Sequence, residues 1–361
     1  ITALVIASFY CVVSGWCLSY TFMSLTQFSV GKSPEAVRNV FSTLASSGDI
    51  SLFWLFLFVL LNVGVVYSGV RKGIEHWSKM LTPALLIILL GLFAFSMTLS
   101  GFSEAVHFVL MPDFSALSPG GVLQALGMAC FTLSVGIGII LTYGSYLDKS
   151  ENLPKTTGII TIMNIVVSLI AALMIFTIVF TFGFEPEGGA GLVFQTMPVL
   201  FAQIKGGLIL STLFFLLFVF TALTSSISLF EMLIANVIEL FGITRSRATL
   251  LIGAAIAILG IPSALSGSGA LFHNWSAIYG QNFFEMLDTI TGSWVMPISG
   301  IATTLFVGWR LSKEVVFDEF ARGSEGAVSL FWLWRFLVRY ITPAAILLII
   351  LTHAGIIDLT K

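Results

Sequence analysis

Charged side chains are scarce in this sequence. Asp, Glu, Lys and Arg make up 9% of its 361 residues, whereas a soluble domain carries about 25%. The mean hydropathy is correspondingly high, at +1.03. A chain with so few charges lacks the surface that keeps a globular domain in solution. With a net charge of −2 and no cluster of basic residues, it also gives no indication of a nucleic-acid partner.

Cysteine and histidine are also too few, and too widely spaced, to build a reactive centre. Cys11, Cys17 and Cys130 lie inside apolar segments, where a buried thiol is inert. No pair of Cys or His residues has the spacing of metal ligands. The histidines stand in loops or at the ends of apolar segments: His76, His107, His273 and His353. We therefore expect neither a Cys/His metal centre nor the catalytic constellation of an enzyme.

Long apolar runs, by contrast, recur along the whole chain. About 20 such residues cross the ~30 Å hydrocarbon core of a bilayer as a helix. The sequence predicts nine spans: 2–27, 51–69, 82–102, 121–147, 155–184, 207–240, 247–265, 281–309 and 329–356. The predicted fold class is an all-α polytopic protein embedded in the lipid bilayer.

The segments between the spans carry turn and capping signals. Ser33-Pro34-Glu35 is a capped helix start and predicts a short surface helix over 33–49. The segment 185–207 is Gly-rich at its ends, with an apolar helical middle that is too short to span. We expect a loop over 266–280.

The basic residues predict the orientation. Alternate loops and span ends hold 12 of the 16 Lys and Arg residues, and the richer side of a membrane protein is cytoplasmic. This places the residue 1 end inside and the C-terminus outside a plasma (inner) membrane. Because Ile1, not Met, begins the chain within a span, we expect a fragment that lacks its N-terminal part.

One predicted span contains residues near its middle that would interrupt a helix. The stretch FTLSVGIGIILTYGSY, residues 131–146, carries Thr132, Ser134, Gly136 and Gly138 near its middle. Irregular backbone is tolerated in hydrocarbon only where it is buried in protein or lines a watered cavity. A break there indicates a binding site, because half-helix ends offer N–H groups to anions and carbonyls to cations. The alternative is that the glycines only allow close helix packing.

Polar side chains recur in three other spans. The sixth span contains FTALTSSISLFEML, with five hydroxyls in eight residues: Thr221, Thr224, Ser225, Ser226 and Ser228. Hydroxyl oxygens suit a small cation such as Na⁺, although Ser and Thr also simply bond the carbonyl four residues back. The fifth span holds Asn164 and, one turn later, Ser168. The first span holds Tyr10, whose hydroxyl needs a partner when buried.

Together these motifs resemble the neurotransmitter:sodium symporter family, the LeuT-like transporters, in its bacterial members. The likeness rests on 131–146, FTALTSSIS, GGAGLVFQTMP and the tyrosine of SFYCVVSGW, and it runs over essentially the whole chain. It implies a LeuT-type inverted-repeat fold, with the nine spans corresponding to spans three to eleven and the first two missing. One transmembrane transporter domain would then fill 1–361, with 1–102 the remainder of the first repeat, 121–309 the second repeat, and 329–356 an additional span.

The resemblance also implies a substrate pocket and two sodium sites. Tyr10 would donate to a substrate carboxylate. The pocket would be lined by Ile6, Tyr10, Phe131, Thr132, Ser134, Ile137, Ser225 and Leu229. Thr132 and Asn164 resemble ligands of a first sodium. The hydroxyls of Thr224 and Ser225, with the Thr221 carbonyl, resemble a second.

Gating roles follow from the same comparison. Asp288 stands where the family places the acidic half of an outer gate, and its arginine partner would lie in a missing span. The alternative is an ordinary interfacial carboxylate. Tyr146 and Glu239 resemble inner-gate residues. Chloride dependence stays open: Ser168 favours it, but Met128 replaces a family glutamine, and a thioether cannot donate to an anion.

The resulting hypothesis is a sodium-coupled symporter that imports an amino acid, or a related small carboxylated amine, by alternating access, and is not an enzyme. A substrate with an apolar side chain is favoured, because the predicted pocket contains Ile6, Phe131, Ile137 and Leu229. The alternatives are a LeuT-fold transporter of another family with a different coupling ion, or a channel, which would need a continuous polar stripe. The oligomeric state is left open.

Overall fold

The computed structural model describes residues 2–26, 32–111, 113–115, 117–148, 150–186, 188–271, 274–323 and 325–357. Helices and the turns between them make up this part of the chain, and it contains no strand. The longer helices are α1 (Thr2–Leu25), α2 (Pro34–Ser46), α3 (Gly48–Tyr67), α4 (His76–Ser96), α6 (Pro119–Thr132), α8 (Leu153–Thr181), α11 (Gly207–Phe241), α12 (Arg245–Leu265), α15 (Met296–Leu305) and α18 (Thr342–His353). The shorter ones are α5 (Phe102–Leu110), α7 (Ile139–Gly144), α9 (Gly189–Gly191), α10 (Met197–Gln203), α13 (Trp275–Tyr279), α14 (Phe283–Ile290), α16 (Lys313–Ala321) and α17 (Phe331–Phe336). Wider π-helical or 3₁₀ turns are η1 (Val70–Glu75), η2 (Leu192–Thr196), η3 (Thr291–Val295), η4 (Phe306–Arg310), η5 (Glu325–Leu330) and η6 (Leu337–Ile341).

Eight helical stretches of the described residues are long and apolar enough to cross a membrane. They are Thr2–Leu25, Gly48–Tyr67, Lys72–Ser96, Leu153–Thr181, Gly207–Phe241, Arg245–Leu265, Phe283–Arg310 and Val328–His353. Each overlaps one of the predicted spans. The predicted span 121–147 is the exception, because its residues form two helices, α6 and α7, with irregular backbone between them.

The connecting segments agree with the sequence in part. Helix α2 begins as predicted, with the Ser33 side chain accepting a hydrogen bond from the Ala36 amide. The middle of 185–207 is helical, as α10. The expectation of a plain loop over 266–280 was wrong, since α13 forms there. Helices α5 and α16 were not foreseen, because each is a nine-residue helix, shorter than the windows in which helical periodicity stands out.

The chain forms two compact units, and their boundaries pass through α8 and α14. The first unit comprises Ala3–Pro112 and Leu169–Leu287, and the second comprises Asp113–Ser168 and Asp288–Lys361. These boundaries differ from those of the predicted repeats. The single transporter domain and its repeat limits therefore stay predictions.

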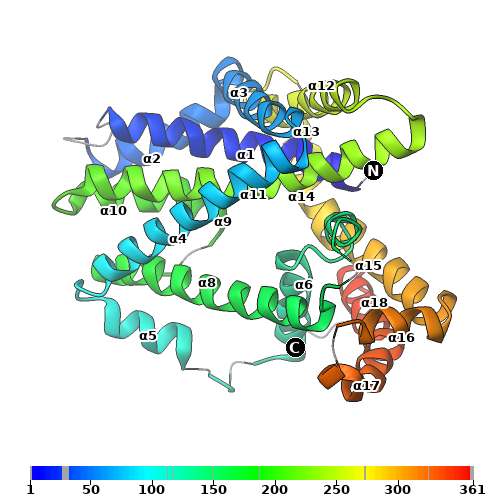
Figure 1. Cartoon of the computed structure of the whole chain (residues 1–361). Helices are drawn as coiled ribbons and strands as arrows, with labels where there is room; N and C mark the ends of the chain where they lie inside the picture. Colours follow the sequence, from blue (N-terminus) through cyan, green and yellow to red (C-terminus); the bar gives the residue numbers. More distant parts are fainter. Residues whose placement is uncertain are drawn as a thin grey trace. The chain divides into compact units, whose positions relative to one another are not determined.

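In the first unit, the helices approach closely where small residues face a neighbouring backbone. Helix α12 packs along α3 (Figure 1). A Cβ at Gly15 of α1 would lie 2.9 Å from the Trp54 carbonyl of α3, so only glycine fits that crossing. The Tyr20 hydroxyl donates to the Phe194 carbonyl at 2.8 Å, which joins α1 to η2. These contacts join α1, α3, α12 and η2, and α11 also packs against α3 and α12.

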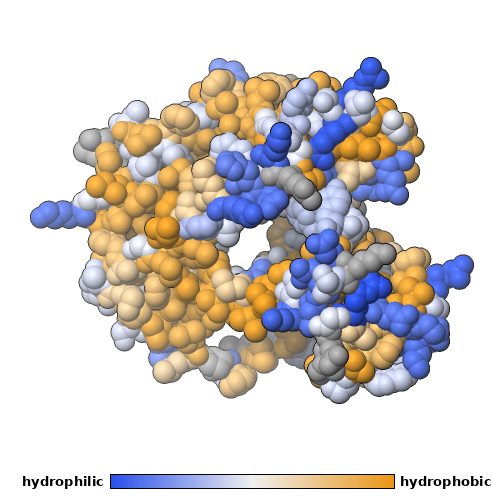
Figure 2. Space-filling model, viewed as in Figure 1, coloured by the Kyte–Doolittle hydropathy of each residue, from blue (hydrophilic) through white to orange (hydrophobic). Residues whose placement is uncertain are grey.

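In the second unit, α15 packs against α18, and α18 also contacts α6. Many apolar side chains of both units stay exposed, as in a protein whose solvent is lipid. On α4, for example, the side chain of Ile87 is 71% exposed, and Figure 2 shows apolar residues over this part of the surface. Such a surface would be unstable in water and is ordinary in a bilayer.

Candidate functional site: a broken helix and a polar helix pair

The predicted break is present in the second unit. Helix α6 ends at Thr132, and α7 begins at Ile139. Between them, Ser134, Gly136 and Gly138 have positive φ angles of 55°, 85° and 102°. Ser134 is the only non-glycine residue in this conformation among the described residues. A side chain in the left-handed region is strained unless its surroundings hold it. The glycines therefore do more than allow close helix packing.

The break leaves backbone acceptors free at the end of α6. The Ser134 and Val135 amides turn back to Phe131 and Cys130. Within the described part of the chain, the Thr132 and Leu133 carbonyls accept no hydrogen bond. The C-terminal end of a helix carries partial negative charge, so these two oxygens can bind a cation. The Thr132 hydroxyl donates to the Met128 carbonyl at 2.8 Å and keeps its lone pairs available.

Helix α15 holds the break in place. The Ser299 hydroxyl donates to the Gly136 carbonyl. A Cβ at Gly136 would lie 2.8 Å from the Gly300 nitrogen and 2.8 Å from the Met296 carbonyl oxygen. The two backbones thus touch at a point where no other residue fits. The sequence pattern predicted the break but did not indicate that α15 packs against it.

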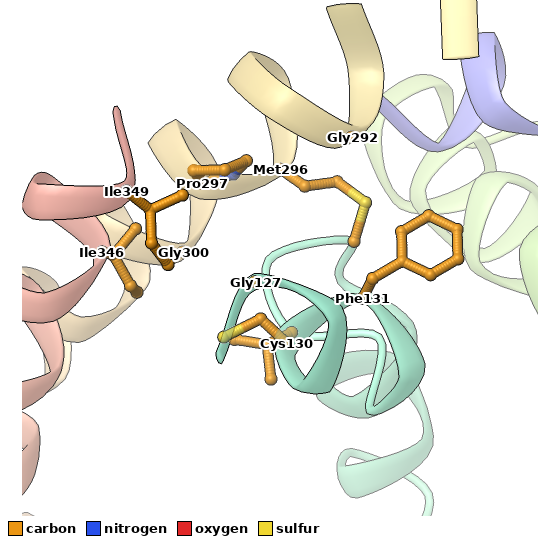
Figure 3. Close-up of a pocket in the computed structure, with 10 residues that line it drawn as sticks. Gly127, Cys130, Phe131, Gly292, Met296, Pro297, Gly300, Ile346 and Ile349 are labelled. Atoms are coloured by element: carbon orange, nitrogen blue, oxygen red, sulfur yellow. The ribbon is translucent and has the colours of Figure 1, made fainter. Parts of the chain in front are cut away.

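A small apolar cavity lies beside the break. Residues of α6, η3, α15 and α18 line it (Figure 3): Gly127, Cys130, Phe131, Val135, Gly292, Met296, Pro297, Gly300, Ile346 and Ile349. Its volume of about 20 Å³ suits one water molecule and is too small for an amino acid. Of the predicted pocket residues only Phe131 reaches it, so it is not the predicted substrate site.

The first unit brings together two of the predicted pocket residues. The Tyr10 hydroxyl of α1 lies close enough to the Ser225 side chain of α11 to interact with it. Ile6, one turn before Tyr10, and Leu229, one turn after Ser225, are both buried. A polar pair flanked by apolar side chains on two packed helices is the composition expected of a small-molecule site.

The hydroxyls of α11 do not form one stripe. The Thr221 hydroxyl donates to the Leu217 carbonyl at 2.8 Å, and that of Thr224 to the Phe220 and Thr221 carbonyls at 3.0 and 2.9 Å. Their lone pairs remain free for a cation. Ser226 instead points into the core and donates to Asn62 Oδ1 of α3 at 2.6 Å. Of the five hydroxyls that the sequence offered to a cation, that of Ser226 is therefore directed elsewhere, because successive helical residues point about 100° apart.

The remaining predicted residues lie apart from these contacts. In the second unit, the Ser168 hydroxyl donates to Asn164 Oδ1 at 3.5 Å, and Ser134 and Ile137 belong to the break itself. Asp288 is exposed on α14 and has no ion pair among the described residues. Tyr146 follows α7 and packs edge-on against Tyr143. In the first unit, Glu239 is exposed near the end of α11.

Sequence reasoning missed one buried ion pair. Glu231 of α11 is fully buried, and both of its carboxylate oxygens accept hydrogen bonds from Arg245 of α12. Arg245 also donates to the Val66 carbonyl of α3 at 3.1 Å. An acidic residue inside an apolar span was the available signal, since such a group requires a partner. Arg245 belongs to the basic residues that predict the cytoplasmic side, and that pattern alone does not indicate its buried partner.

Comparison with known proteins identifies the class. The model of the Sodium:neurotransmitter symporter family matches residues 33–360. The chain is 35% identical, over 98% of its length and 78% of the relative's, to an uncharacterized sodium-dependent transporter, YhdH, of Bacillus subtilis. It is 32% identical, over 96% of its length and 76% of the relative's, to an uncharacterized sodium-dependent transporter of Haemophilus influenzae.

A solved structure agrees with these sequence relatives. The crystal structure of MhsT in complex with L-phenylalanine is similar, with a TM-score of 0.86, 36% identity, and coverage of 97% of this chain and 79% of that one. The helical architecture is therefore that of the LeuT-type transporters, as the motifs indicated. The family consists of transporters, not enzymes. This multi-pass membrane protein belongs to the Sodium:neurotransmitter symporter family.

Proposed function

We propose that this sodium-coupled symporter carries amino acids, and that its preferred substrates have apolar side chains. The observation that supports this most is the break after α6, which presents unpaired Thr132 and Leu133 carbonyls at a helix end. Free carbonyls bind a cation, and a bound Na⁺ attracts a carboxylate. The related MhsT was solved with L-phenylalanine, which makes an amino acid the natural candidate.

In this proposal, the Tyr10 hydroxyl donates to the substrate carboxylate. The Tyr10 side chain lies near Ser225, which stands between Thr224 and the buried Ser226 on α11. The aliphatic side chains of Ile6, Ile137 and Leu229 are each less than 9% exposed and would exclude a charged substrate side chain. Phe131 and Ser134 would contribute the face supplied by the break.

Two sodium sites would couple this substrate to the ion gradient. The first would use the Thr132 oxygens and the Asn164 amide oxygen. The second would use the hydroxyls of Thr224 and Ser225 and the Thr221 carbonyl. In each threonine the hydroxyl hydrogen is already donated to a carbonyl of the same helix, so the oxygen faces outward as an acceptor. Hard oxygen ligands of this kind suit Na⁺.

Transport would follow alternating access. Each Na⁺ that enters gains about 2.3 kcal/mol per 100 mV of membrane potential, and this favours the state that binds substrate. Asp288 would act at an outer gate, and Tyr146 and Glu239 at an inner one. We place the residue 1 end inside and the C-terminus outside the cytoplasmic membrane, from the distribution of Lys and Arg. Chloride dependence is decided by comparing uptake in chloride and gluconate buffers.

The test is uptake by the complete protein in proteoliposomes, with a panel of labelled L-amino acids and an inward gradient of Na⁺ or of K⁺. We expect Na⁺-dependent, saturable uptake of large apolar amino acids. Uptake that is equal in K⁺ would refute the sodium coupling, and saturable uptake of a non-carboxylated amine alone would refute the amino-acid assignment.

Two variants of α11 then distinguish an effect on the proposed sodium site from a general effect on the helix. Thr224→Ala removes a proposed sodium ligand and should raise the Na⁺ concentration for half-maximal uptake. Thr212→Ala removes a hydroxyl with the same kind of bond, to the Leu208 carbonyl at 2.8 Å, outside the proposed site. It should leave the Na⁺ dependence unchanged.

A further inference from the structure

A basic–aromatic cluster lies on the second unit, where η4 and the start of α16 meet α17 and η6. It consists of Trp309, Lys313, Trp332, Arg335 and Arg339. The Arg339 guanidinium lies 4.2 Å from the centre of the Trp309 ring, and the Lys313 ammonium lies 4.2 Å from that of Trp332. The Trp309 indole N–H donates to the Arg339 carbonyl at 3.1 Å. These contacts fix two cations, Lys313 and Arg339, against two aromatic rings, and Arg335 lies close enough to act on Glu314, the neighbour of Lys313.

The two arginines of the cluster lack carboxylate partners. Neither Arg335 nor Arg339 forms an ion pair among the described residues. Arg335 Nη1 and Arg339 Nε are also buried without a hydrogen-bond acceptor in the described part of the chain. A guanidinium with unsatisfied N–H groups is costly inside a membrane protein. The other guanidinium nitrogens of these two arginines are not among the buried atoms that lack an acceptor, and a guanidinium is the group best suited to a phosphate, which it binds through parallel hydrogen bonds.

The acidic residues of α16 do not cancel the charge of the cluster, although Glu314 lies close enough to interact with Lys313 and Arg335. Glu314 is at the start of α16, and its pKa is lowered first by the hydrogen bond from its own backbone amide and then by the Ser312 side chain, with smaller effects from Lys313 and Arg335. Glu319 pairs with Arg322 at 2.8 Å. The remaining described acid of α16 is Asp318, one turn beyond Glu314. The cluster keeps a positive surplus.

The cluster borders an apolar surface formed by α17 and η6. Trp332 is 61% exposed, and Leu333, Phe336 and Leu337 are also exposed. Figure 2 shows hydrophilic and apolar side chains interleaved over α16 and α17. Exposed tryptophan beside exposed leucine and phenylalanine is typical of the level where lipid headgroups meet acyl chains. An anion at this cluster would therefore have acyl chains available on its apolar side.

We propose that the basic–aromatic cluster binds the phosphate of an anionic phospholipid, with Arg335 and Arg339 as the principal ligands and the exposed apolar residues of α17 and η6 against its chains. Basic pockets between membrane helices bind such headgroups. A free phosphate would use the same guanidinium chemistry but would gain nothing from the apolar border, so the two sources can be separated.

The experiment measures lipid retention by native mass spectrometry of the complete protein, taken from nanodiscs of phosphatidylcholine with or without one quarter phosphatidylglycerol. The wild type should retain phosphatidylglycerol in preference to phosphatidylcholine. Arg335→Gln with Arg339→Gln should weaken this retention about 30-fold, which equals about 2 kcal/mol for two basic groups at 1.4 kcal/mol per tenfold change. The charge-matched control, Lys155→Gln with Arg247→Gln, removes two exposed basic residues on the same predicted side and should retain the lipid.

Three further arms make the outcome decisive. Arg335→Lys with Arg339→Lys keeps the charges and should restore most of the retention, which excludes misfolding as the cause of a loss. Glycerol 3-phosphate and inorganic phosphate, added at millimolar concentration to the nanodiscs that contain phosphatidylglycerol, should not displace that lipid. Equal loss in the Lys155/Arg247 control would show nonspecific attraction, and displacement by free phosphate would show a soluble-anion site. Either result would overturn the proposal.

Discussion

Removing Arg245 should destabilise the first unit more than any other single change at an exposed or partly exposed position. The perturbation is Arg245→Met, which keeps the length of the side chain and removes the charge. In the structure, Arg245 binds both carboxylate oxygens of Glu231 and the Val66 carbonyl. It therefore ties the start of α12 to the middle of α11 and the end of α3.

The size of the destabilisation follows from the buried Glu231 charge, which loses its ion-pair partner in Arg245→Met. The Glu231 side chain is 0% exposed and that of Arg245 is 26% exposed. Breaking a buried pair by removing one partner costs about 3–5 kcal/mol, because the other charge stays buried and unpaired. Since Arg245 is partly exposed, water can reach its place, and we expect about 3 kcal/mol, at the lower end of that range. Removing both charges, as in Glu231→Leu with Arg245→Met, should cost much less than the single change.

The assay is thermal unfolding in one detergent, for the wild type, both single variants and the double variant. One kcal/mol moves the midpoint by about 2–4 °C in proteins of 150–250 residues. Arg245→Met should therefore lower it by roughly 6 °C or more. The double-mutant cycle should give a coupling energy within the range of about 0.5–3 kcal/mol found for residues in contact. Unchanged stability of Arg245→Met, or strict additivity of the two single changes, would refute this reasoning.

Three predictions concern the site. Tyr10→Phe keeps the ring but deletes its donor, so substrate affinity should fall by about 1.5–3 kcal/mol; equilibrium binding that is undiminished in a folded variant would remove Tyr10 from the site. Thr132→Ala and Asn164→Ala should each raise the Na⁺ concentration for half-maximal binding, and an unchanged Na⁺ dependence in both would contradict the first sodium site. Gly136→Ala puts a methyl group 2.8 Å from the Gly300 nitrogen at a φ of 85°, so transport should be lost while helical circular dichroism is retained. Normal uptake would show that the break can shift.

Several features could be predicted from the chain alone because they depend on local composition. Apolar length and scarce charge fixed the helical spans, since a bilayer accepts little else. The run Thr132 to Gly138 predicted irregular backbone, and the structure has it. The motifs also pointed to the correct family. Short helices such as α5 and α16 escaped prediction because their periodicity is too brief.

The partners of each polar residue were decided only by the tertiary structure. Ser225 and Ser226 are neighbours in sequence, yet Ser225 lies near Tyr10 of α1 and Ser226 donates a hydrogen bond to Asn62 of α3, because a helix turns successive side chains about 100° apart. The sequence motif that contains Glu231 does not indicate its ion pair, and only the packing of α12 against α11 brings Arg245 to it. Ser299 and Gly300, which contact the break, belong to a helix more than 150 residues further along the chain. Composition and periodicity specify which segments are buried in the membrane, and only packing specifies which groups meet there.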